Sequence, residues 1–112
     1  MEKEDLTKEL EVVVNSIRTL QQQCHAIAVE KGFWDSARNN GELIALMHSE
    51  LSEALEELRM REVNWDNVTE ELADLMIRAF DFAEGRGIDL GKAIMTKMAK
   101  NMLRPYKHGK TF

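Results

Sequence analysis

The sequence is poor in residues that interrupt or cross-link a chain. It has one cysteine, Cys24, one proline and six glycines in 112 residues. A single cysteine excludes an intramolecular disulfide and fits a reducing compartment. Few prolines and glycines leave little room for the many turns of a strand-rich fold, so the composition favours helices.

Long apolar runs and an excess of basic charge are also missing. No stretch approaches the roughly 20 apolar residues that a membrane span needs, and the opening MEKEDLTKEL lacks the apolar core of a signal peptide. We therefore expect a cytoplasmic protein with no membrane partner. Fifteen basic against 20 acidic residues give a net charge of −5, which argues against nucleic acid as a partner.

The charge is unevenly distributed along the chain. Ten acidic and two basic residues lie between Glu42 and Asp74, whereas six basic residues and no acidic one lie between Leu90 and Phe112. An acidic middle and a basic tail suggest one segment that holds cations and another that holds an anion.

Apolar periodicity predicts four helices in a single domain of residues 1–112. The first helix, from about Asp5 to Lys31, carries an a/d seam sustained for more than three heptads. The seam consists of Leu6, Leu10, Val13, Ile17, Leu20, Cys24 and Ile27. The second helix is expected from about Glu42 to Arg61.

The remaining two helices are predicted from their end signals. A capping box of Asn67 and Glu70 starts the third helix, which ends before Gly85-Arg86-Gly87 and is apolar over more than half its circumference, so we expect it to be largely buried. Asp89 caps the fourth helix, which ends by Arg104.

Short connections between these helices predict an all-α antiparallel four-helix bundle. The long seam of the first helix exceeds what one small core needs, so we expect a homo-oligomer, with a dimer as the default and a tetramer as the alternative.

Two acidic pairs border apolar surface on consecutive helices. Glu50 and Glu53 lie on the second helix, and Glu71 and Asp74 on the third, each pair three residues apart and therefore on one face. Antiparallel packing lets the pairs converge, and four converging carboxylates repel one another unless cations are present. Oxygen ligands without cysteine or clustered histidine favour Mg²⁺, or Mn²⁺, over zinc.

A solvated polar face is the alternative interpretation of these acids. Glu-x-x-Glu alone is a weak signal, and Asp74 with Arg78, at i and i+4, has the spacing of a local ion pair.

A polar stripe on the fourth helix matches the chemistry of a phosphate. Lys97, Asn101 and Arg104 fall at i, i+4 and i+7, where they offer hydrogen-bond donors to phosphate oxygens. Lysines and arginines near a helix C-terminus also interact well with the helix dipole, which is the simpler account of Arg104. Trp34, in the loop after the first helix, either stacks on a nucleobase or plugs one end of the bundle.

These segments together resemble the MazG family of all-α nucleoside triphosphate pyrophosphohydrolases. Glu50-x-x-Glu53, a spacer of seventeen residues and Glu71-x-x-Asp74 match the family's ExxE…ExxD signature. The words GELIALMHSELSEALEELR, EELADLMIRAFDFAE and KMAKNMLRPYKHGKTF extend the resemblance over roughly residues 25 to 110. Some family members have an additional acid at the position of Ser49.

The resemblance implies a reaction and a set of roles. Family members cleave (d)NTPs between the α and β phosphates, which yields a nucleoside monophosphate and pyrophosphate. Glu50, Glu53, Glu71 and Asp74 would ligate Mg²⁺, with Glu50 or Glu53 as the catalytic base, while Lys97, Asn101 and Arg104 would bind phosphates.

Two other functions are alternatives to nucleotide hydrolysis. A di-iron bundle would need Glu-x-x-His pairs, which the sequence lacks because Ala45 precedes His48 and Gln22 precedes His25 at that spacing. A non-catalytic helical or nucleotide-binding module with a degenerate site is the main alternative.

Overall fold

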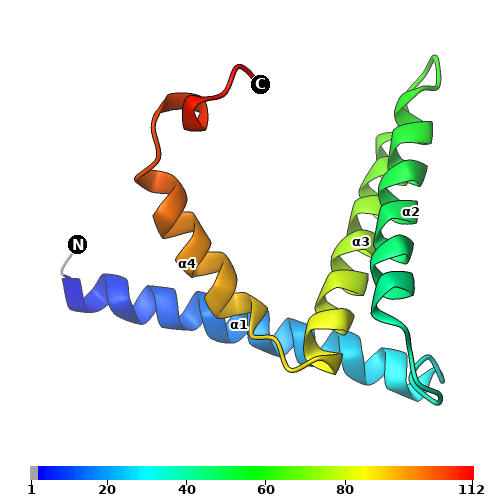
Figure 1. The fold of residues 1–112 in the computed structure, drawn as a ribbon, viewed down its shortest axis with the longest axis horizontal. Coiled ribbons are helices and arrows are strands. Elements are labelled where there is room, and N and C mark those ends of the chain that lie inside the picture. Colours follow the sequence, from blue (N-terminus) through cyan, green and yellow to red (C-terminus); the bar gives the residue numbers. More distant parts are fainter. Residues whose placement is uncertain (1–2) are drawn as a thin grey trace. The chain divides into compact units, whose positions relative to one another are not determined.

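The computed structural model describes residues 3–112, with side chains from residue 8 onward. These residues form four α-helices: α1 (Lys3–Glu30), α2 (Asn40–Leu58), α3 (Trp65–Gly85) and α4 (Leu90–Met102). A short 3₁₀ turn, η1 (Tyr106–Gly109), follows, and the described residues contain no strand (Figure 1). The predicted all-α class and the order of the four helices are confirmed. No helix in this part of the chain has the length and apolarity that crossing a membrane requires.

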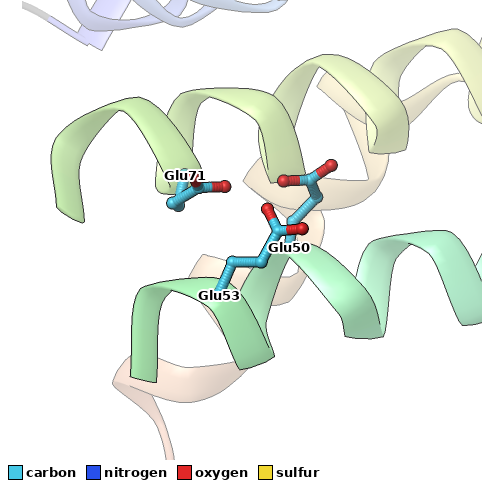
Figure 2. Close-up of side chains that lie close together, drawn as sticks. All are labelled: Glu50, Glu53 and Glu71. Carbon is cyan, nitrogen blue, oxygen red and sulfur yellow. The ribbon is translucent and has the colours of Figure 1, made fainter. Parts of the chain in front are cut away.

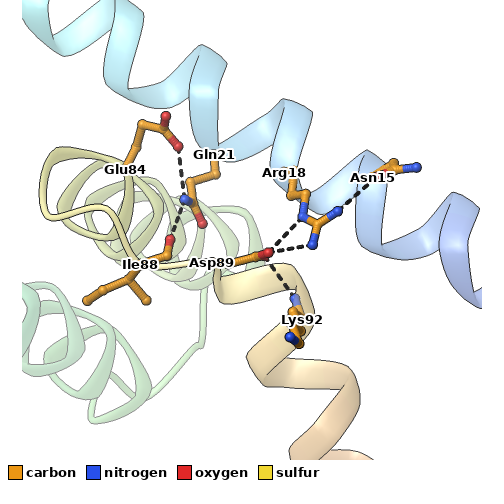
Figure 3. Close-up of polar contacts among 7 residues, drawn as sticks. All are labelled: Asn15, Arg18, Gln21, Glu84, Ile88, Asp89 and Lys92. Carbon is orange, nitrogen blue, oxygen red and sulfur yellow. Dashed lines mark hydrogen bonds and ion pairs between the residues drawn. The ribbon is translucent and has the colours of Figure 1, made fainter.

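Most helix ends lie within a few residues of their predicted positions. Gly32, after α1, and Gly87, after α3, adopt positive φ angles of 88° and 68°, a conformation that side chains with a Cβ disfavour. Asp89 caps α4 as expected, since its side chain accepts a hydrogen bond from the backbone N–H of Lys92 (Figure 3).

The predicted start of α3 was wrong. Its N-cap is Asn64, whose side-chain oxygen accepts from the backbone N–H of Asn67 at 3.2 Å. Asn67 is therefore inside the first helical turn, and its side chain donates to Glu57 on α2. The capping box fails because an equally good capping residue stands three positions earlier.

The contacts of the chain divide it into two compact units, residues 21–88 and residues 1–20 with 89–112. In the first unit, α2 and α3 form an antiparallel hairpin, and the last turns of α1 join it (Figure 1). Six buried apolar residues form the core of this unit: Cys24, Leu43, Ala54, Val68, Phe80 and Ala83. Gln21 attaches α1 to the end of α3 by donating to Glu84 and to the carbonyl of Ile88 (Figure 3).

The second unit pairs the first part of α1 with α4. Arg18 donates through Nε to Asp89 at 2.9 Å (Figure 3), and the Arg18 guanidinium holds the pKa of Asp89 below its usual value. Gly91 approaches α1 so closely that a Cβ there would lie 2.8 Å from the carbonyl oxygen of Val14. A side chain at position 91 would therefore separate the two helices.

Much of the predicted apolar surface is exposed in a single chain. Leu10, Val13, Leu20 and Ile27 of the α1 seam are 42%, 43%, 46% and 60% exposed, while the side chain of Leu6 lies outside the described residues. The expectation that α3 is largely buried was also wrong for one chain, because Leu72, Met76 and Ile77 are exposed while Val68, Phe80 and Ala83 are buried.

Candidate metal centre

Three glutamates from α2 and α3 meet between the two helices. Glu50 and Glu53 project from neighbouring turns of α2, and Glu71 projects from α3 opposite them (Figure 2). One carboxylate oxygen from each lies within 4.8 Å of the other two. We call Glu50, Glu53 and Glu71 the carboxylate cluster. Their convergence follows from the i, i+3 spacing on α2 and the antiparallel packing of α3.

The members of the carboxylate cluster differ in their exposure to solvent. Glu50 is 6% exposed, Glu71 is half-buried and Glu53 is exposed. Oε2 of Glu50 and Oε2 of Glu71 are both buried, and neither has a hydrogen-bond partner among the described residues. A buried carboxylate oxygen without a donor is costly, so these two atoms require an explanation.

A basic side chain contacts the carboxylate cluster at Glu50. Arg78, on α3, donates through Nε to Oε1 of Glu50 at 2.9 Å. This hydrogen bond lowers the pKa of Glu50, whereas burial acts to raise it; the effect of the hydrogen bond is the larger. The neighbouring carboxylates of Glu53 and Glu50 raise the pKa of Glu71 to about 7. Hydrogen bonding to the carboxylates of Glu53 and Glu50, which favours the protonated form of Glu71, is the main cause of this shift, and burial and the nearby negative charges add to it.

The donor set fits a hard divalent cation. Three carboxylates face one guanidinium, so the cluster keeps excess negative charge, and two of its buried oxygens have no donor within residues 3–112. Carboxylate oxygens are the ligands that Mg²⁺, Mn²⁺ and Ca²⁺ take in proteins. Glu50 and Glu71 would hold such a cation, and the cation would neutralise part of the negative charge of the cluster.

Asp74, the fourth predicted ligand, lies outside the carboxylate cluster in this structure. It is half-buried and lines a cavity together with Glu50 and Arg78. The local Asp74–Arg78 ion pair does not form either, because Arg78 turns across to Glu50 on α2. The structure therefore brings three of the four predicted ligands together and places the fourth beside them.

A cavity of about 270 Å³ adjoins the carboxylate cluster. Its charged lining residues come from the loop that follows α1, from α2 and from α3, and they are Lys31, Arg38, Glu50, Asp74, Arg78 and Asp81. Its apolar lining comes from Cys24, Ile27, Ala28, Phe33 and Ile77. The cavity thus combines an apolar wall with charged groups, and Glu50 is one of these groups.

A polar network around Asp81, which was not predicted from the sequence, lies next to this cavity. Asp81 is 8% exposed, and its Oδ1 accepts from Nε1 of Trp34 at 2.9 Å and lies 2.8 Å from Nδ1 of His25. Its Oδ2 lies 3.9 Å from Nη1 of Arg38. Asp81 follows Asp74 by seven residues, two helical turns, and this spacing was the available signal.

Trp34 is held by its neighbours inside the first unit. The guanidinium carbons of Arg38 and Arg86 each lie 5.4 Å from its ring, and a Cβ on Gly85 would come within 2.4 Å of the ring. The indole therefore packs against the end of α3. Stacking of Trp34 on a nucleobase stays a prediction.

The predicted phosphate ligands lie in the second unit. Lys97 and Asn101 fall one turn apart on α4, while Arg104 follows the end of the helix. Oδ1 of Asn101 is buried and has no hydrogen-bond partner in the described chain. Lys97 also lines a cavity with Lys92 and Lys100. Their role as phosphate ligands stays a prediction.

Comparison of the chain with protein-family models, with curated proteins and with solved structures found no match.

Proposed function

We propose that this protein is a Mg²⁺-dependent nucleoside triphosphate pyrophosphohydrolase that converts (d)NTP to (d)NMP and pyrophosphate, as its resemblance to the MazG family implies. The carboxylate cluster carries this proposal, since two of its buried oxygens have no donor among the described residues. A solvated acidic patch would expose its oxygens to water, whereas here Oε2 of Glu50 and Oε2 of Glu71 are buried, and the side chains of the cluster lie between α2 and α3 (Figure 2).

The members of the carboxylate cluster would have different roles because their surroundings differ. Bound Mg²⁺ or Mn²⁺ would lower the pKa of a coordinated water and neutralise charge on the phosphates. Glu50 and Glu71 supply the buried oxygens that would hold it. Glu53 is the better candidate for the base, because it is exposed to the incoming water and because Arg78 lowers the pKa of Glu50 and so makes Glu50 a weaker base.

The neighbouring cavity is the proposed place for the nucleoside. Its apolar wall offers Phe33 and Ile77 to a base, and it reaches Glu50, so a nucleoside there has its phosphates next to the carboxylate cluster. Asp74 would complete the ligand set from the cavity side. Lys97, Asn101 and Arg104 are proposed to bind the non-bridging phosphate oxygens.

We propose further that the active form is a homodimer or a dimer of dimers in which the four-helix bundle is completed. No large side chain among the described residues is fully buried, and the exposed apolar residues include most of the α1 seam. We expect a second copy of the chain to cover this seam. Two copies carry the same a/d spacing, so the seam of one can pack against the seam of the other.

The test of the activity is a product analysis. The purified protein is incubated with each common dNTP and NTP, with MgCl₂ or with EDTA, and pyrophosphate and orthophosphate are measured separately. We expect pyrophosphate and the monophosphate only when Mg²⁺ is present. Release of orthophosphate and a diphosphate would point to cleavage at a different bond and would contradict the proposal.

Two substitutions give this assay its controls. Glu71→Gln removes one charge from the cluster and should abolish pyrophosphate release. Glu56→Gln is the matched control, because Glu56 lies on the exposed side of α2, where it pairs with Arg59. A wild-type protein that binds Mg²⁺ and nucleotide yet releases no pyrophosphate would instead favour the nucleotide-binding module.

A further inference from the structure

Arg78 contacts the carboxylate cluster through Glu50. Its Nε bonds Oε1 of Glu50 across the two helices, and the Glu50 side chain is only 8% exposed while that of Arg78 is 39% exposed. A charge-assisted hydrogen bond to a buried carboxylate is stronger and more directional than a pair in water. The bond therefore constrains the rotation of the Glu50 carboxylate.

The two oxygens of Glu50 have different surroundings as a result. Oε1 accepts from Arg78, whereas Oε2 is buried and has no partner among residues 3–112. Figure 2 shows one oxygen of Glu50 directed toward Glu53 and Glu71 and the other directed away from them. A cation in the cluster and the guanidinium of Arg78 thus have separate atoms to bind.

We propose that Arg78 is a positioning residue, which fixes one oxygen of Glu50 so that the other serves as the single ligand atom of that glutamate for a divalent cation. The inference rests on the proposed metal site and extends it. Residues that hold metal ligands by hydrogen bonds commonly change metal affinity when they are replaced. Arg78 would act in this way without touching the cation.

A purely structural ion pair makes a different prediction. Such a pair would stabilise the packing of α2 on α3, so its loss would lower the melting temperature and leave cation affinity unchanged. A guanidinium that competes with the cation for Glu50 makes a third prediction, since its removal would strengthen cation binding. Cation affinity therefore separates the three roles by the direction of its change.

The experiment measures Mn²⁺ and Mg²⁺ binding by titration calorimetry on folded protein, without nucleotide. Arg78→Met keeps much of the apolar stem and removes the donors, and we expect about 10- to 100-fold weaker binding. Arg78→Lys keeps the charge without the planar fork, so its affinity should lie between those of wild type and Arg78→Met. Arg59→Met is the matched control, because Arg59 makes an equally short bond, 2.9 Å, to the exposed Glu56, and its affinity should not change.

The outcomes separate this inference from the proposed function. Unchanged or tighter binding in Arg78→Met overturns the positioning role while the metal site stands. If Arg78→Met does not fold, Arg78→Lys decides, and wild-type affinity in that variant overturns the role. A wild-type protein that binds neither cation overturns the metal site and this inference together.

Discussion

Glu50 and Glu71 show how two identical side chains in one cluster acquire opposite properties. Arg78 lowers the pKa of Glu50, while the carboxylates of Glu53 and Glu50 raise the pKa of Glu71 to about 7. The spacing of the acids could be predicted from the sequence because it depends on helical geometry alone. The choice of Arg78 as the partner of Glu50 could not, because it depends on how α2 and α3 are rotated against each other.

The raised pKa of Glu71 predicts a pH dependence of stability in the metal-free protein. Its ordinary value is 4.5 and its folded value is about 7, so between these values the folded state binds more protons than the unfolded state. Stability from this group is present below pH 4.5 and decreases as the pH rises through 7. The ionisable groups that act on Glu71 are Glu50 and Glu53 on α2.

Urea unfolding in EDTA, at pH 5 and at pH 7.5, measures this effect. The quantity compared is the free energy of unfolding of wild type and of Glu71→Gln. We expect wild type to lose stability relative to Glu71→Gln as the pH increases. Saturating Mg²⁺ should restore the stability of wild type at pH 7.5 and should not increase the stability of Glu71→Gln. A difference that does not depend on pH would contradict the assigned pKa.

At the scale of elements, helix existence was easier to predict than helix boundaries. The apolar period and the glycines at 32, 85 and 87 located all four helices, yet α3 begins at Trp65 because Asn64 caps it. Two asparagines three residues apart are equivalent in sequence, and only the fold decides between them. The Asp81 network was missed for a related reason, since it joins α3 to α1 and to the loop that follows α1.

The assignment of the α3 cap predicts unequal effects of two similar substitutions. Asn64→Ala removes the acceptor for the Asn67 N–H and should cost about 1 kcal/mol. Asn67→Ala removes only an exposed 3.3 Å bond to Glu57 and should cost less. Chemical denaturation of both variants compares them directly, and a larger loss in Asn67→Ala would restore the capping box.

The contact between Trp34 and Gly85 predicts a steric effect at the end of α3. A Cβ at position 85 would lie 2.4 Å from the Trp34 ring, so Gly85→Ala should destabilise the protein by about 1–3 kcal/mol although alanine favours helices. Gly41→Ala, whose Cβ would meet one oxygen of Asn39 at 3.1 Å, is the control and should change stability less. Equal stability of Gly85→Ala and wild type would show that the ring moves aside freely.

At the scale of the whole molecule, the main feature is how little apolar surface one chain buries. The seam of α1 predicts self-association. Charged side chains introduced into the seam should therefore weaken the association. Leu10→Glu or Val13→Glu places a carboxylate in the seam and should dissociate the assembly, because burying an unpaired charge is strongly unfavourable. Light scattering coupled to size-exclusion chromatography measures the mass.

Val12→Glu is the matched control for the seam. Val12 is 64% exposed and lies off the a/d positions, so we expect the same mass as wild type. A monomeric wild type at micromolar concentration, or seam variants that keep the wild-type mass, would contradict the proposed assembly.

The surroundings of Trp34 give the protein an intrinsic optical reporter. Its indole N–H is bonded to Asp81 and its ring faces Arg38, and both of these residues line the cavity beside Glu50. The other tryptophan, Trp65, is 65% exposed at the start of α3 and contributes a solvent-like background. With Trp65→Phe in place, the emission of a single fluorophore would follow occupancy of the cavity without any label.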